Sequence, residues 1–269
     1  MNFRRVVLAG TVLAAAGCSS GGGGGGLTPN ALIAAVVGLE VGSTTTAQLV
    51  QTGPDSPEGD IEITWQDGPL AGQTQKFIWT PTGYVLDKPD HEGSLVTMAS
   101  ATSGLESAFA VVGGAHNVTV SPTTGHVALG HVGSPLSNIP AGTLTYAQAN
   151  GVNALAISET GGTQVDCSPT GSCIGDVQIL ANFSTGGVNG TFSNFDGDLE
   201  TIGFTGTMAG DQATYSASSL TYGGGSASGQ LIGGFYGSGA VVTSGVFDLT
   251  VMDTGTARLL GGYAAAVTP

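Results

Sequence analysis

Apolar and polar positions alternate along most of the second half of the chain. In its clearest stretch, residues 244–251, one set is Gly245, Phe247, Leu249 and Val251, and the other is Ser244, Val246, Asp248 and Thr250. Successive side chains of a β-strand point to opposite faces, so this period of two predicts a strand. Upstream, Leu231 and Phe235 share a face in a second strand. Residues 230–251 are therefore expected to form two strands joined by a glycine turn.

The same pattern recurs between residues 140 and 269. Alternating segments are found at 144–146, 177–183, 188–193, 202–208 and 215–217. Short, evenly spaced strands separated by glycine turns are typical of a meandering closed barrel, and about eight strands fit here. The predicted inward-facing rings are Phe192, Phe204, Phe235 and Phe247. Val246, on the opposite face from Phe247, is expected to tolerate a polar residue.

The first half of the chain predicts a further β region, residues 27–139. Candidate strands are 61–65, 76–79, 94–99, 108–112, 118–120 and 126–129, and the apolar segment 31–37 is of uncertain type. The roughly 240 residues that follow the leader could form one large domain or two small ones. We expect an all-β protein with a barrel at 140–269.

The N-terminus has the form of an export signal. Arg4 and Arg5 precede an uncharged run of eleven residues, 6–16, which is too short to span a bilayer as a mature helix. Small residues then lead to Cys18. This arrangement predicts a lipoprotein signal at 1–17 with lipid on Cys18, and the alternative is a plain secretory signal. Six glycines follow, so residues 18–26 are expected to be a flexible tether.

Charge narrows the choice of partners. Removal of Arg4 and Arg5 leaves three basic residues against nineteen acidic ones, a net charge of about −16. Such a surface repels nucleic acid and anionic membranes. It suits a cationic partner, or simply solubility outside the cell.

The other two cysteines, Cys167 and Cys173, flank the turn-like sequence Ser-Pro-Thr-Gly-Ser. In an exported protein this spacing favours a disulfide that closes the loop. A shared metal is the alternative, but no further ligands lie nearby in the sequence.

Catalytic motifs are absent from the sequence. Outside the predicted leader and tether, where residues 17–21 match Gly-x-Ser-x-Gly without a preceding strand, that motif does not occur, and the sequence has no HExxH and no phosphate-binding loop. The acidic run 196–200 is either a calcium loop without its full set of oxygen ligands or a solvated hairpin turn. The chain is not expected to be an enzyme.

Histidines are the remaining candidates for ligand binding. All four, including His116, His126 and His131, precede the predicted barrel. Histidines on adjacent strands can ligate haem iron or a transition metal. Ordinary surface histidines are the alternative. Haem is thus the one candidate cofactor, and no metal site is assigned.

Three segments carry a family resemblance. Phe235-Tyr236-Gly237, Ala240 and Gly245-Val246-Phe247 resemble, without gaps, the signature F-Y-G-P-x-A-x-E-x-x-G-x-F of the barrel domain of the transferrin-binding protein B family. Ser238 replaces the usual proline, and valines at 241–242 replace acidic residues. Residues 142–146, at the start of the predicted barrel, are similar to the family's G-T-A-T-Y. Residues 126–132 resemble the family segment Y-V-x-x-G-x-W, with His126 in place of the tyrosine and Val132 in place of the tryptophan.

The resemblance implies an architecture and a function. Relatives include factor H binding protein and the hemophilin type, which are surface lipoproteins of Gram-negative bacteria. It implies a handle-like β domain at 27–139, followed by an eight-stranded up-and-down barrel. The implied function is binding of a host or environmental iron carrier, haem or another protein at the outer membrane, without catalysis. A structural or adhesive surface lipoprotein with no small-molecule ligand is the alternative.

Overall fold

The structure is a computed structural model and is all-β in the part that it describes. That part comprises residues 31–38, 41–48, 61–64, 74–80, 83–87, 91–117, 123–132, 134, 136–158, 172–252 and 256–269. The first eight strands are β1 (Ala31–Gly38), β2 (Val41–Gln48), β3 (Ile61–Thr64), β4 (Thr74–Thr80), β5 (Gly83–Asp87), β6 (His91–Ser103), β7 (Glu106–Asn117) and β8 (Thr123–Val132). The last eight are β9 (Thr143–Ser158), β10 (Ser172–Asn182), β11 (Gly187–Ser193), β12 (Ile202–Met208), β13 (Thr214–Tyr222), β14 (Gly225–Tyr236), β15 (Val242–Met252) and β16 (Thr256–Val267).

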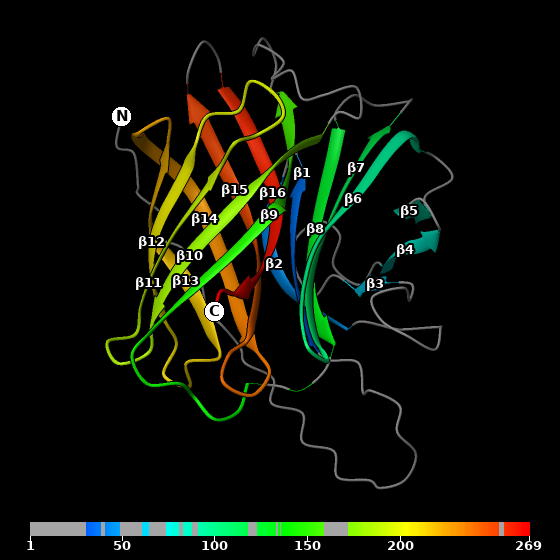
Figure 1. Cartoon of the computed structure of the whole chain (residues 1–269). Coiled ribbons are helices and arrows are strands. Elements are labelled where there is room, and N and C mark those ends of the chain that lie inside the picture. The colour runs from blue at the N-terminus through cyan, green and yellow to red at the C-terminus, as the bar shows by residue number, and fades with distance from the viewer. Residues whose placement is uncertain are drawn as a thin grey trace, which may run out of the picture.

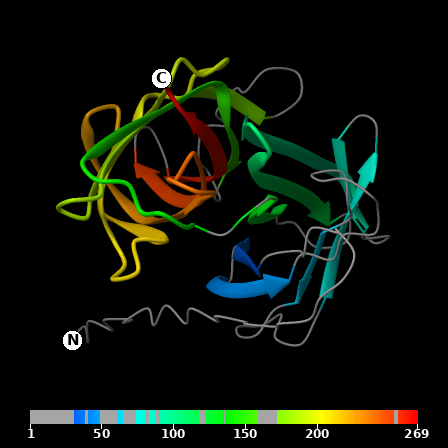
Figure 2. The ribbon, with the colours of Figure 1, turned by 60° about the horizontal axis from the view of Figure 1, so that its bottom comes forward.

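The last eight strands close into the predicted barrel. Each pairs antiparallel with its neighbour in sequence, and β16 pairs with β9 to close the ring (Figure 2). The hairpin predicted at 230–251 is β14–β15, in which Leu231 pairs with Phe247 and Phe235 with Thr243. Phe192, Phe204, Phe235 and Phe247 are all buried, so their predicted inward direction is confirmed.

Aromatic rings fill the inside of the barrel. Phe192 is in ring contact with Phe204, Phe247 and Tyr263, with centroid distances of 5.7, 5.3 and 4.7 Å. At one end Phe235 lies against Tyr146, Phe183 and Tyr215, with centroids 4.8–5.5 Å away. The interior is therefore a packed core.

The first part of the chain forms two smaller sheets beside the barrel (Figure 1). A five-stranded sheet has the order β2-β1-β8-β7-β6, and a three-stranded sheet has the order β3-β4-β5. The apolar segment of uncertain type is β1, which lies between β2 and β8. Candidate strand 118–120 falls outside the described residues.

The five-stranded sheet packs against the outside of the barrel. A cluster of buried side chains joins Ala110 and Val112 of β7 to Leu155 of β9, Val246 of β15 and Leu260 of β16. We call this cluster the seam. Val246 is only 1% exposed, which contradicts the basis of the expectation that it tolerates a polar residue. The alternation had placed Val246 on the outer face correctly, but that face is covered here by a second sheet.

Candidate functional site: a hollow on the open side of the barrel

The two sides of the barrel differ in what covers them. Strands β15, β16 and β9 contact β6 and β7 of the five-stranded sheet, whereas β11 and β12 lie on the far side of the barrel (Figure 1). A shallow hollow of about 420 Å³ lies on β10 to β13, on this open side. Since aromatic rings fill the interior, the outer surface is where the barrel offers space to a ligand.

Register explains how the hollow is assembled. In one row across the sheet, Gln178 pairs with Thr191, Thr191 with Gly203, and Gly203 with Thr221. In the next row on the same face, the paired residues are Leu180, Asn189, Thr205 and Ser219. Directly paired residues of antiparallel strands share a face, so these two rows point outward together.

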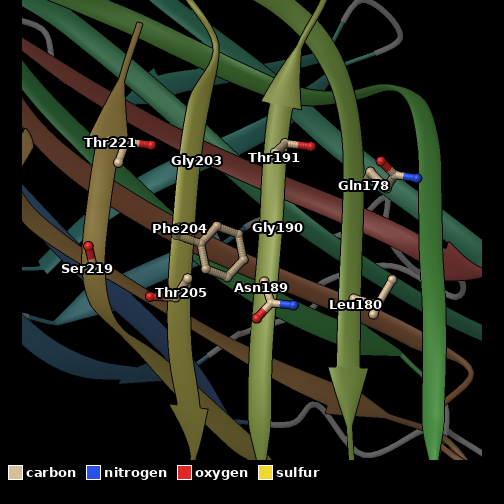
Figure 3. Close-up of a pocket in the computed structure, with 10 residues that line it drawn as sticks. All are labelled: Gln178, Leu180, Asn189, Gly190, Thr191, Gly203, Phe204, Thr205, Ser219 and Thr221. Carbon is tan, nitrogen blue, oxygen red and sulfur yellow. The ribbon is translucent and has the colours of Figure 1, made fainter. Parts of the chain in front are cut away.

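Glycines form the floor of the hollow. Gly203 stands in the outward row, where a Cβ would lie 2.6 Å from Oγ1 of Thr221. Gly190 pairs with Phe204, and a Cβ there would collide with the Phe204 ring on the inner side. Figure 3 shows that ring lying between β12 and β11 at the level of Gly190. On the outer face the hollow thus owes its space to the missing side chain at Gly203, whereas at Gly190 the backbone lies directly in front of an interior aromatic ring.

Hydrogen-bonding groups surround this floor. The polar members are the side chains of Gln178, Asn189, Thr191, Thr205, Ser219 and Thr221 (Figure 3). Among the described residues, none of these six side chains forms a hydrogen bond within the protein. Their amide and hydroxyl groups are both donors and acceptors, so they are available to solvent or to a ligand.

The charged residue of β10 nearest to the hollow, Asp176, already has hydrogen-bond partners within the protein. Asp176 precedes Gln178 by two residues. Its Oδ1 accepts a hydrogen bond from the Asn150 backbone N–H at 3.0 Å, and its Oδ2 accepts one from Nδ2 of Asn194 at 2.9 Å. The bond from Asn194, followed by that from Asn150, lowers the pKa of the Asp176 carboxyl. Asp176 therefore stays ionised and binds Asn150 of β9 and Asn194 of the β11–β12 connection.

The three candidate histidines lie in the five-stranded sheet, away from the hollow. His116 pairs with Thr123, while His126 pairs with Gly113 and His131 with Ala108. His126 and His131 are thus three and eight register positions from His116, or about 10 and about 26 Å along the strands at roughly 3.3 Å per residue. The register does not place any two of the three directly opposite each other. Their role in binding remains a prediction.

The other predicted sites are only partly described. Cys18, the tether and Cys167 lie outside the described residues. Cys173 is buried in β10, and its pairing with Cys167 remains a prediction. Asp196 and Asp198 are exposed in the β11–β12 connection, and Oδ1 of Asp196 accepts a hydrogen bond from the Ile174 backbone. No group of three or more potential metal ligands is found in the described part of the chain.

The residues that carry the family resemblance have structural roles. Phe235 and Phe247 are interior rings. Gly237 turns the chain with a φ of 81°, and Ala240, with a φ of 58°, is fully buried and offers its carbonyl to the Tyr146 hydroxyl at 2.6 Å. At Gly245 a Cβ would collide with the Tyr263 hydroxyl. The signature thus describes how the barrel packs, and it contributes no residue to the hollow.

Together these features define a class of all-β protein in which a filled, closed eight-stranded antiparallel barrel is packed on one side against a separate sheet. No long apolar helix capable of crossing a membrane occurs in the described segments. Neither protein-family models nor curated proteins give a match to the chain.

Solved structures of transferrin binding protein B are similar to this chain. The isotype 1 protein of serogroup B Neisseria meningitidis matches 88% of this chain and 43% of its own, with 12% identity and a TM-score of 0.48. A double mutant of the protein from Haemophilus parasuis Hp5 matches 88% and 44%, with 11% identity and a TM-score of 0.46. The chain spans less than half the length of these structures.

Proposed function

We propose that this chain is a lipid-anchored protein of the Gram-negative outer membrane that faces the cell surface and binds a ligand on the outside of its barrel, without catalysis. The observation that carries the proposal is the contrast between the filled interior and the open hollow lined by six unpaired polar side chains. The leader ending at Cys18 and the resemblance of residues 235–247 to transferrin-binding protein B support the anchor and the surface location.

The groups in the hollow suit recognition better than reaction. Hydroxyls of serine and threonine become nucleophiles only with an adjacent base that removes their proton. Among the ten residues that line the hollow there is no histidine, carboxylate, lysine or cysteine. These neutral groups can orient a ligand through hydrogen bonds but offer no acid or base near neutral pH.

The ligand classes that follow from the resemblance are an iron carrier, haem or another protein. The experiment immobilises the purified mature chain and measures binding of iron-loaded transferrin and of haemin directly, alongside recovery of bound components from host fluids by mass spectrometry. Saturable binding that excess soluble protein competes away is the expected result. If no component binds saturably, the structural or adhesive alternative replaces this proposal.

Haem binding has a test of its own. Replacing His116, His126 and His131 one at a time with alanine should abolish the haemin absorbance band if one of them ligates the iron. If haemin binding is unchanged in all three variants, these histidines are ordinary residues of the sheet.

A further inference from the structure

We infer that the hollow on β10 to β13 is a binding site for a neutral carbohydrate, held as one or two sugar units of a longer glycan. The inference deepens the proposed function, on which it rests, by giving the site a ligand class. It depends on the chemistry of the lining, the shape of the floor and the position of the hollow.

The first step concerns charge. The whole chain carries a net charge of −14, yet all ten residues that line the hollow are uncharged. An anionic ligand would meet the negative surface of the protein without a cationic partner, and a cationic ligand would find no carboxylate in the hollow. Specific binding of either ion requires desolvated charges to be paired. The lining therefore favours a neutral ligand.

The second step concerns hydrogen bonding. The amides of Gln178 and Asn189 and four hydroxyl groups each donate and accept, and none of them has a hydrogen-bond partner among the described residues. A ligand that uses such groups well must itself present many atoms that both donate and accept. Sugar hydroxyls have this property. An apolar ligand would leave the six groups unpaired, which costs free energy.

The third step concerns the apolar patches between these groups. Leu180 is 42% exposed at one edge of the hollow, and Gly190 and Gly203 leave the floor beside it without polar side chains; the Phe204 ring, 4% exposed, lies behind Gly190 (Figure 3). A pyranose ring has an apolar C–H face and a rim of hydroxyls, which matches an apolar patch bordered by amides and hydroxyls. The hollow's volume of about 420 Å³ lies within the usual range of roughly 300–1,000 Å³ for small-molecule sites.

The fourth step concerns access. Strands β11 and β12, which carry much of the hollow, lie on the side of the barrel away from the seam (Figure 1). The hollow is shallow, so it admits the middle of an extended chain. A surface protein with such a site would attach to a polysaccharide matrix or to a glycan carried by another protein. Direct hydrogen bonds to the sugar would make binding insensitive to salt, because no charges are paired.

The test uses the full mature chain and a panel of named glycans. Neutral members are maltoheptaose, cellohexaose and mannan, and acidic members are polygalacturonate and heparin. Binding is measured by biolayer interferometry at low and high salt. Saturable, salt-independent binding of at least one neutral member is expected, whereas failure of all three neutral members, or binding of the acidic members alone, overturns the inference.

Variants locate the site. Gly203→Val fills the floor and should abolish binding, while Asn189→Ala removes one exposed amide and should weaken it about three- to tenfold. Thr207→Val changes an exposed residue of β12 outside the hollow and should have no effect. Circular dichroism melts check that each variant folds, and the exposed position of Asn189 keeps the test valid even if Gly203→Val does not fold. Glycan binding that survives Asn189→Ala unchanged would place the site elsewhere and refute the inference.

These outcomes separate the inference from the proposed function. If no neutral glycan binds but a protein or haem ligand does, the carbohydrate assignment fails and the binding function stands. If no protein, haem or host component binds either, the structural or adhesive alternative replaces the binding function as well.

Discussion

The hydroxyl groups of Tyr215 and Tyr263 lie 2.7 Å apart at the centre of the barrel, in space left by two glycines. A Cβ on Gly233 would come within 2.6 Å of the Tyr263 hydroxyl, and one on Gly245 would collide with the same ring. Thr243 completes the group, since its hydroxyl lies 2.9 Å from that of Tyr215 and donates to the Gly234 carbonyl at 2.8 Å. The three buried hydroxyl groups of Tyr215, Thr243 and Tyr263 thus find hydrogen-bond partners without a charged side chain among them.

Adding one methyl group at this centre should be costly. Gly245→Ala is expected to lower the free energy of unfolding by about 1–3 kcal/mol, because the Tyr263 ring must move in a packed core. Urea denaturation measures this value. Gly210→Ala is the matched control, since a Cβ there meets nothing within 4 Å, and its effect should stay within about 0.5 kcal/mol. Equal losses in the two variants would show that crowding at Tyr263 is not the cause.

The buried tyrosines predict a loss of stability at high pH. Desolvation raises the pKa of Tyr215 to about 12, and burial also raises the pKa values of Tyr146 and Tyr263 above their ordinary value. The unfolded chain releases these protons near pH 10, so the stabilisation is complete below pH 10 and falls as the pH rises through 10 to 12 and beyond.

Two measurements follow this titration. Melting temperature should stay constant up to about pH 9 and then fall. Absorbance of tyrosinate in native protein should rise later than in guanidinium-unfolded protein, and together with the loss of structure. Coincident native and unfolded titration curves would mean that these hydroxyls are accessible to water.

The seam predicts an unusual sensitivity on the outside of the barrel. Val246→Thr keeps the shape of the side chain but buries a hydroxyl among Ala110, Val112 and Leu260. We expect a loss of about 1–3 kcal/mol in the free energy of unfolding if that hydroxyl stays without a partner. Thr207→Val, the reverse exchange at an exposed outward position of β12, should change the value by less than about 0.5 kcal/mol. If Val246→Thr leaves the free energy of unfolding unchanged, the five-stranded sheet does not stay packed against the barrel in solution.

Phe192 lies in the barrel interior in contact with three other aromatic rings. Phe192→Ala should cost about 3–5 kcal/mol, because it removes buried surface and leaves a cavity. Phe192→Leu retains most of the volume and should cost clearly less. Thermal and denaturant unfolding of both variants gives the comparison, and similar losses would mean that ring packing contributes little here.

Membrane attachment can be tested at a single atom. Cys18→Ser removes the sulfur that would carry lipid, so the variant should leave the membrane fraction or remain as uncut precursor. Fractionation followed by mass spectrometry of the N-terminus distinguishes the two results. Normal membrane attachment and maturation of Cys18→Ser would rule out the lipoprotein assignment.

The sequence was sufficient to predict the barrel, because its inward positions are apolar at every second residue. It also held an overlooked indication of the seam: Val246 and Leu260 are apolar at outward positions, where a solvent-facing strand would have polar residues. The hollow could not be predicted in the same way. Its threonines and amides resemble ordinary exposed residues until the register places Gly203 between Thr191 and Thr221.

Strand β15 is buried on both faces over most of its length. Each residue from Val242 to Leu249 is buried, since rings lie on one side and the five-stranded sheet on the other. Amide hydrogens in β15 should therefore exchange with deuterium last, and those of β11 to β13, whose outer face is open, should exchange earlier through local opening. A ligand held in the hollow would slow exchange in β11 to β13 and leave β15 unchanged, which separates binding at this face from a general stabilisation of the fold.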